Sequence, residues 1–193
     1  RSGGFIMAGV QIDGVNNKID FDDDLDTSIS ANTDDTLVIE AGGNTMATIT
    51  ATTFTINDGT TITTADNTDT LTLVSTDADA NIGPNLNLYR NSSSPADNDV
   101  TGVIAYNGRN DNSQDVIYAR QLSYIKDASD GTEDGQLTLQ TMVAGTIRDR
   151  LNITPTEISL NEDSQDLDFR VESNGNANMI FVDGGNDHVN IGT

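Results

Sequence analysis

Residues 115–154 read DVIYARQLSYIKDASDGTEDGQLTLQTMVAGTIRDRLNIT and contain three strand-like segments joined by two corners. The corners ASDGTEDG and VAG contain Gly, and the first is also rich in Asp; both residue types favour turns because they tolerate unusual backbone angles. Two similar strand-like segments come earlier, at residues 84–92 and 99–111. Five strands at roughly 12-residue spacing predict a compact antiparallel module over residues 83–155, sandwich-like or barrel-like.

Shorter and less apolar segments surround this module. In residues 45–59, TMATITATTFTINDG, Thr or Ala alternates with larger apolar residues, as in a strand with one buried face. Two further strands are expected at residues 60–67 and 69–77. Residues 37–45 and 169–177 share a pattern of apolar, Glu, Gly and Asn positions, which indicates related hairpins on both sides of the module.

The predicted fold is therefore all-β, with an elongated fibrous β shaft interrupted by the compact module. We expect residues 1–82 to form β-repeats of the shaft and residues 156–193 to form a β-hairpin shaft. Aromatic residues make up only 5% of the chain and Trp is absent, so one chain offers little bulk for a core. The thin apolar stripe predicts that the chain buries it against copies of itself.

The charge balance excludes several kinds of partner. Nine Lys and Arg stand against 31 Asp and Glu, a formal net charge of -22. Nucleic acid and anionic membranes would be repelled by such a chain. No stretch approaches the roughly 18 consecutive apolar residues of a membrane span, so membrane insertion is not expected. Because Cys is absent, disulfides and thiolate metal sites are excluded.

The later part of the chain resembles a known class of viral proteins. The run that begins GPNLNLYRNS at residue 83, and above all the closing FRVESNGNANMIFVDGGNDHVNIGT at residues 169–193, is similar to tail-fibre and tail-spike-like structural proteins of tailed bacteriophages. The resemblance implies a triple-β-helix or β-prism-like shaft, a parallel homotrimer and an extracellular place on the virion tail or capsid. It also implies a C-terminal intramolecular chaperone domain, which the sequence does not contain.

In such a fibre, recognition is expected in loops, because loops on a rigid scaffold carry most binding sites. The exposed candidates are the loops at residues 92–99, 108–114 and 128–135. The receptor-contact candidates within them are Asn98, Arg109, Asn110 and Asp130. The expected partners are two further copies of the chain, other virion proteins and a receptor or glycan on the host cell.

An acidic segment, DFDDDLDTSISANT, invites a comparison with calcium loops. Asp22, Asp24 and Asp26 stand at alternate positions, as at the start of an EF-hand, but Thr27 replaces the required Gly and Thr33 the required Glu. Alternate Asp residues on a strand would share one face, where they repel each other unless solvated or bridged by a cation. A solvated face is the favoured interpretation, and structural Ca²⁺ or Mg²⁺ at these three residues is the alternative.

The last segment, FVDGGNDHVNIGT, is interpreted as a tight corner between two strands. Gly184 and Gly185 supply backbone freedom, and the single His188 follows Asp187 on a strand, where neighbours point to opposite faces. No nucleophile-elbow motif accompanies them. Enzymatic activity is therefore not expected.

Two other functional classes stay open. A calcium-dependent bacterial surface adhesin or filament subunit would share acidic, Thr-rich strands without Cys, and would bind ions at Asp22, Asp24 and Asp26. A glycan-depolymerising spike would need only a pair of carboxylates at catalytic separation. With 31 acidic residues, no such pair is singled out by the sequence.

Overall fold

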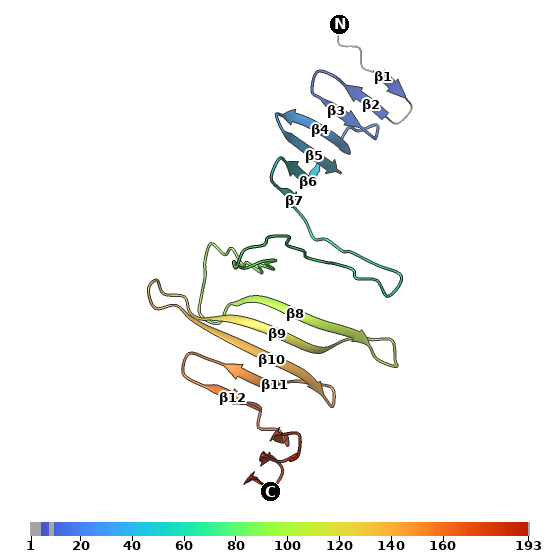
Figure 1. The fold of residues 1–193 in the computed structure, drawn as a ribbon. Coiled ribbons are helices and arrows are strands. Elements are labelled where there is room, and N and C mark those ends of the chain that lie inside the picture. Colours follow the sequence, from blue (N-terminus) through green and yellow to red (C-terminus); the bar gives the residue numbers. More distant parts are fainter. Residues whose placement is uncertain (1–4, 8–9, 193) are drawn as a thin grey trace. The chain divides into compact units, whose positions relative to one another are not determined.

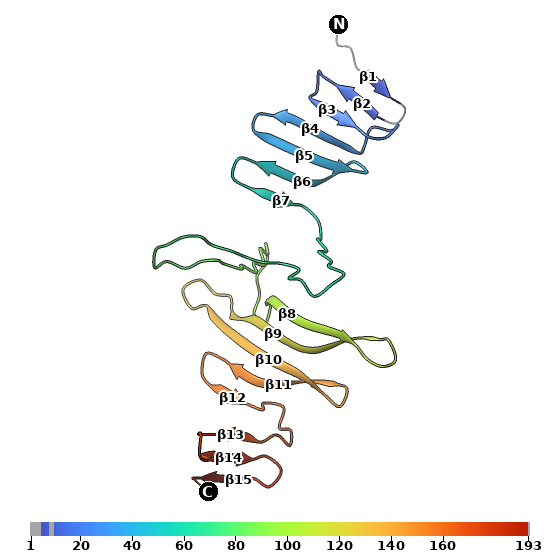
Figure 2. The ribbon, with the colours of Figure 1, turned by 45° about the vertical axis from the view of Figure 1, so that its right-hand side comes forward.

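The computed structural model describes residues 5–7 and 10–192, and this part of the chain contains no helix. The prediction of an all-β protein built from antiparallel sheets is confirmed (Figures 1 and 2). The chain divides into two compact units, Arg1–Pro84 and Asn85–Thr193. Residues 1–4, 8, 9 and 193 of the predicted shaft segments lie outside the described residues.

The first unit holds a seven-stranded antiparallel sheet in which each strand pairs with the next. Its strands are β1 (Phe5–Met7), β2 (Val10–Asp13), β3 (Lys18–Asp20), β4 (Ser28–Thr33), β5 (Thr36–Ala41), β6 (Asn44–Thr50) and β7 (Phe54–Ile56). The strand register aligns one aliphatic residue from each of β2 to β7 in a row across the sheet. We call this the isoleucine row: Ile12, Ile19, Ile29, Ile39, Ala47 and Ile56.

The opposite face of this sheet is polar, and its buried Asp20 Oδ1 is held by an ion pair and has no hydrogen-bond partner within the described residues. Asp20 is buried and forms an ion pair with Lys18 at 2.7 Å. Ser28 lies between Asp20 and Glu40 in the register and donates a hydrogen bond to Glu40 at 2.9 Å. One sheet thus separates polar and aliphatic side chains onto its two faces, as the period-2 alternation of a strand requires.

The strands expected at residues 60–67, 69–77 and 84–92 are not formed. Every residue from 51 to 91 is exposed, and regular strand is absent from residue 57 to residue 99. A strand needs a neighbour for its backbone N–H and C=O groups, and the described part of this chain offers none to these segments. Their alternation of Thr with Ile, Leu and Val is real, but alternation alone does not supply a pairing partner.

The second unit contains a single five-stranded sheet instead of the two layers of a sandwich. The strands are β8 (Val100–Arg109), β9 (Asp115–Asp127), β10 (Asp134–Val143), β11 (Thr146–Ile153) and β12 (Ile158–Leu160). Each pairs with the next in a meander. The fifth strand is β12, which lies beyond the predicted end of the module at residue 155, because the segment at 84–92 stays unpaired.

One face of this sheet carries two aliphatic rows, which we call the aliphatic face. The first row crosses β8 to β12 through Gly102, Ser123, Leu137, Ile153 and Ile158. The second row, two residues away on each strand, is Ile104, Gln121, Leu139, Leu151 and Leu160. Neither row contains a charged residue.

The other face of the five-stranded sheet carries a chain of hydrogen bonds. Arg120 Nε donates to Gln140, and Gln140 Nε2 donates to Asp149, each at 2.5 Å. Asn152 Nδ2 donates to Asp149 at 2.9 Å, and Thr138 Oγ1 donates to Asn152 at 2.6 Å. We call this the polar face; most of its side chains bond to one another, whereas Ser159 Oγ, opposite Asn152, is buried without a hydrogen-bond partner in the described chain.

A three-stranded sheet ends the chain, with β13 (Phe169–Val171), β14 (Ile180–Asp183) and β15 (His188–Ile191). The predicted corner between β14 and β15 is confirmed, since a turn occupies residues 184–187. Asp183 Oδ1 accepts hydrogen bonds from the N–H groups of Gly185 and Asn186 at 3.1 and 2.9 Å. A Cβ atom at Gly184 would lie 2.5 Å from the carbonyl oxygen of Leu167, so this position requires glycine.

Candidate functional site

Two of the three predicted recognition loops meet at one end of the five-stranded sheet. The N–H of Asn98 donates to the carbonyl of Ile125 at 2.6 Å, and Lys126 Nζ donates to Asn98 Oδ1 at 2.5 Å. The N–H of Ala128 donates to Asp97 Oδ1 at 2.9 Å. The loop before β8 is therefore bonded to the end of β9, beside the β9–β10 turn that carries the exposed Asp130.

The third loop, at residues 108–114, lies at the opposite end of the same sheet because it is the β8–β9 hairpin (Figure 1). Arg109 there forms an exposed ion pair with Asp115 at 3.1 Å. Asn110 closes its own turn, since its Oδ1 accepts the N–H groups of Asn112 and Gln114 at 3.1 and 2.9 Å. The candidates thus divide into Asn98 with Asp130 at one end and Arg109 with Asn110 at the other.

An open cleft of about 360 Å³ lies at the end that carries Asn98 and Asp130. Its lining comes from both loops and from β9 and β10: Pro95, Tyr124, Ile125, Asp127, Ala128, Glu133, Asp134 and Gly135. The lining combines an aromatic ring and apolar side chains with three carboxylates. Such a cleft suits a ligand that offers hydroxyl or cationic groups around an apolar body, because carboxylates accept hydrogen bonds from both.

The Asp127 carboxylate is the best defined polar group of this cleft. Its oxygens accept hydrogen bonds from the N–H of Ser129 at 2.8 Å and from the Thr132 hydroxyl at 3.3 Å. The backbone hydrogen bond from Ser129 lowers the pKa of Asp127 below its usual range. Asp127 therefore stays ionised at neutral pH and holds the β9–β10 turn in shape.

Sequence reasoning did not single out Tyr124 or Asp127 as site residues, because both lie within a predicted strand. Their place at the cleft follows from the register, which sets Tyr124 opposite Gln136 and Asp127 opposite Asp134. The only sequence signal was that all four Tyr residues fall within the module.

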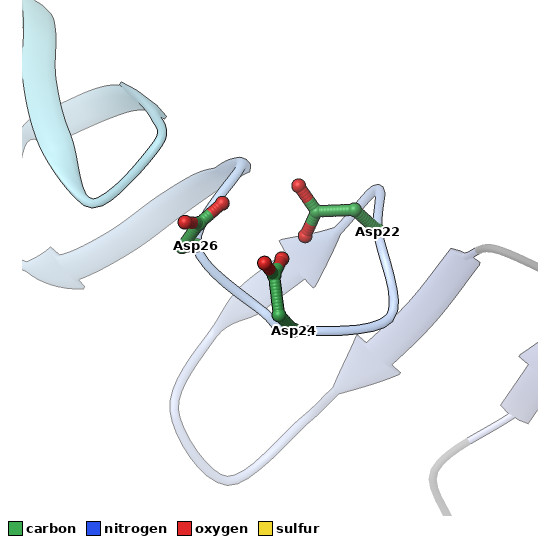
Figure 3. Close-up of side chains that lie close together, drawn as sticks. All are labelled: Asp22, Asp24 and Asp26. Atoms are coloured by element: carbon green, nitrogen blue, oxygen red, sulfur yellow. The ribbon is translucent and has the colours of Figure 1, made fainter.

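The three acidic candidates for a metal site are close in space. Asp22, Asp24 and Asp26 each offer an oxygen, and these atoms lie within 4.8 Å of one another (Figure 3). The expectation that they share one face of a strand is wrong, because all three belong to the turn between β3 and β4. The turn forms because Leu25 adopts a left-handed φ of 66° and the Phe21 N–H bonds to the Thr27 carbonyl at 2.9 Å.

The local environment shifts the pKa values of Asp22 and Asp26 in opposite directions. Hydrogen bonding from Thr27 lowers the pKa of Asp22. Desolvation and the nearby charges of Asp24 and Asp22 raise the pKa of Asp26. Three carboxylates would supply three of the six to eight oxygen ligands that Ca²⁺ takes, leaving the rest to water or backbone.

The single histidine lies at the base of the last turn. His188 is exposed and lies opposite Asp183 in the β14–β15 register. Hydrogen bonding from Asn186 is the main cause of the lowered pKa of Asp183, and His188 adds to it through its charge. The arrangement is that of a turn closed by the Asp183 side chain.

No described segment forms a helix of the length and apolarity needed to cross a membrane. Comparisons with protein families, with curated proteins and with solved structures gave no match to this chain.

Proposed function

We propose that this chain is a structural and adhesive segment of a tailed-bacteriophage virion fibre, which assembles as a parallel homotrimer and spaces or presents a host-binding surface. The virion setting and the number three rest on the sequence resemblance. The need for partner copies rests on the exposed surface of the chain, which is the observation that carries the proposal.

The accessible surface is too large for a chain that folds alone. The chain exposes 14583 Å², and its mass is 20.5 kDa. Two separate compact units of about half that mass each would together expose about 10,700 Å², so the excess is roughly 3,900 Å². A standard stable interface removes about 800 Å² from each partner. The excess is sufficient for extensive contact with two neighbours.

The interior supports the same proposal. In the part of the chain that the structure describes, the buried hydrophobic side chains are Ala47 and Leu122. Hydrophobic burial is the dominant favourable contribution to folding, and two such residues do not stabilise a chain of this length. We propose that association with further copies of the chain buries the hydrophobic side chains that a single chain leaves exposed.

The host-binding surface is assigned to the cleft end of the five-stranded sheet. The cleft lined by Tyr124, Glu133 and Asp134 combines an aromatic ring with hydrogen-bonding groups. It lies beside two loops that are joined by the hydrogen bond from Ala128 to Asp97. A glycan or another polyhydroxylated surface group of the host cell fits this chemistry, because hydroxyls donate to carboxylates and sugar faces stack on aromatic rings. The proposed role is one of binding, without catalysis.

The assembly is tested by measuring mass and symmetry. Light scattering after size exclusion is expected to give three times the chain mass, and electron-microscopy class averages are expected to show a three-fold axis. A monomer that stays folded at micromolar concentration would overturn the proposal.

One observation favours a second candidate. The clustered carboxylates of Asp22, Asp24 and Asp26 suit a calcium-dependent bacterial adhesin or filament subunit. That candidate requires polymerisation beyond a trimer when calcium is added and its reversal by a chelator, so the same light-scattering experiment separates the two.

A further inference from the structure

We infer that copies of this chain pack against one another through the aliphatic face of the β8–β12 sheet, while the polar face of that sheet points away from the partners. This inference rests on the proposed self-association and adds the surface that mediates it. The occupant of the aliphatic face is a second copy of the same chain.

The side chains of the aliphatic face are too exposed for a soluble surface. Leu139 at the centre of the sheet is 38% exposed, and Ile158 on the edge strand is 72% exposed. Leu88, from the unpaired segment, approaches the position where a Cβ of Gly102 would stand, at 3.0 Å, and so covers only the β8 side. The rest of the face has no cover within the described chain.

The charge distribution identifies the occupant. The chain carries a net charge of -22, so two copies repel each other wherever their acidic side chains meet. The two aliphatic rows contain Ser123 and Gln121 as their only polar side chains and have no charge. The two rows therefore form a region where identical copies can approach without acidic side chains meeting. Arg148, opposite Thr141 in the next row, borders this region with a positive charge.

The polar face has no comparable need for a partner. Thr138 is 1% exposed and Asn152 is 4% exposed, and both are hydrogen-bonded within the chain. The charges of Arg120 and Asp149 are likewise engaged through Gln140. Covering this face would bury charged groups further, which costs free energy.

The other two sheets repeat the same division, which supports the inference independently. The isoleucine row crosses the seven-stranded sheet without a charged residue. In the last sheet, Val171, Ile180 and Ile191 align in one row, and Ile191 is 76% exposed. An aliphatic row with exposed members on each of the three sheets is expected of a chain that associates along its whole length.

The test compares Leu139→Asp with Val103→Asp. Val103 lies on the opposite face of the same sheet and is 44% exposed, so the two positions are matched in exposure. Leu139→Asp is expected to lower the Tm of the assembly more than Val103→Asp does, because it places a charge between copies while the rows of the other two sheets still hold the chains together. A folded Leu139→Asp protein that melts at the same temperature as Val103→Asp would overturn the inference.

A second pair of variants decides the matter if Leu139→Asp does not fold. Because the chain has no Cys, Leu139→Cys and Val103→Cys each introduce a single thiol. A short bismaleimide is expected to link Leu139→Cys chains to one another and to leave Val103→Cys chains unlinked. The reverse result in an oligomeric protein would contradict the assigned face, whereas a monomeric wild type would contradict the proposed function instead.

Discussion

Thr138 and Asn152 lie directly opposite each other on β10 and β11, and the Thr138 hydroxyl donates a hydrogen bond to Asn152 Oδ1 at 2.6 Å. Both side chains are buried, although they are polar. The most buried side chains of this sheet, Thr138, Asn152 and the neighbouring Leu122, therefore lie on its polar face, and the aliphatic side chains of the opposite face are more exposed in the single chain.

The first prediction concerns this pair. Thr138→Val keeps the shape of the side chain but removes the 2.6 Å hydrogen bond, which leaves the buried Asn152 Oδ1 with only the longer bond from Gln136 Nε2 at 3.3 Å. We expect the free energy of unfolding to fall by about 1–3 kcal/mol. Thr146→Val, at an exposed position of β11, is the control and is expected to change it by less than about 0.5 kcal/mol. Denaturant unfolding at one fixed chain concentration measures both, and equal effects would refute the prediction.

Gly184 provides a second prediction. In Gly184→Ala the new methyl group would meet the backbone of Leu167, and the β14–β15 turn would have to shift. We expect a loss of about 1–3 kcal/mol in the free energy of unfolding. Gly175→Ala is the matched control, because no atom lies within 4 Å of its ideal Cβ position. The idea fails if the two variants unfold at the same denaturant concentration.

Two Asp residues of the turn between β3 and β4 are predicted to have opposite effects on the stability of the folded chain. The pKa of Asp26 is raised, so its ionised form is disfavoured in the folded chain. The stability that protonated Asp26 contributes is therefore lost as pH rises through that pKa. The pKa of Asp22 is lowered, so its ionised form is favoured in the folded chain. The stability that ionised Asp22 contributes is present at neutral pH and is lost as pH falls through that pKa. At pH 7, Asp26→Asn should raise Tm slightly and Asp22→Asn should lower it. Calorimetry of the two variants without divalent ions checks this, and shifts of one sign would contradict it.

The acidic balance predicts a dependence on salt. Three copies, each with a net charge of -22, repel one another. The Debye length shortens from about 30 Å at 0.01 M salt to about 8 Å at 0.15 M, so Tm should rise over this range. Calcium chloride at equal ionic strength is the control. A gain with calcium beyond that with sodium chloride would indicate a specific site at Asp22, Asp24 and Asp26, and a Tm independent of salt would contradict the prediction.

The proposed receptor surface predicts a difference between the two ends of the five-stranded sheet. Tyr124→Ala removes the aromatic ring of the cleft. We expect the purified protein to lose about tenfold or more in its ability to block phage adsorption to host cells, since truncation of an aromatic hot-spot residue costs about 2 kcal/mol or more. Arg109→Ala at the opposite end should block adsorption as the wild type does. Loss of blocking by Arg109→Ala alone would move the receptor surface to the β8–β9 hairpin.

Several features were predictable because they depend on neighbouring residues only. The Asp and Gly residues around Gly184 indicated the last turn. The alternation in residues 45–59 indicated one strand, but a bend at residues 51 and 52 divides it into β6 and β7. The same alternation failed at residues 60–67 and 69–77, where no strand forms. Alternation reports which side chains would share a face, but it does not report whether a neighbouring strand is present.

The sequence indicated which loops are exposed, but it did not indicate which of them lie together in one candidate site. Residues 92–99 and 128–135 were both expected to be exposed, yet their contact depends on hydrogen bonds between segments about thirty positions apart, such as that from Ala128 to Asp97. The cleft residue Tyr124 was hidden in a strand. Turn chemistry is local, whereas the meeting of two loops is set by the order and register of the strands between them.

The sequence by itself determined that this chain is all-β, acidic and too poor in large apolar residues to form an ordinary core. The tertiary structure decided which side chains meet. The bulge between Leu139 and Gln140 keeps Leu139 opposite Leu151 and brings Gln140 opposite Asp149, so that aliphatic and polar groups separate onto two faces. A shift of one residue would have mixed them, because side chains alternate along a strand and only long-range pairing fixes which residue faces which.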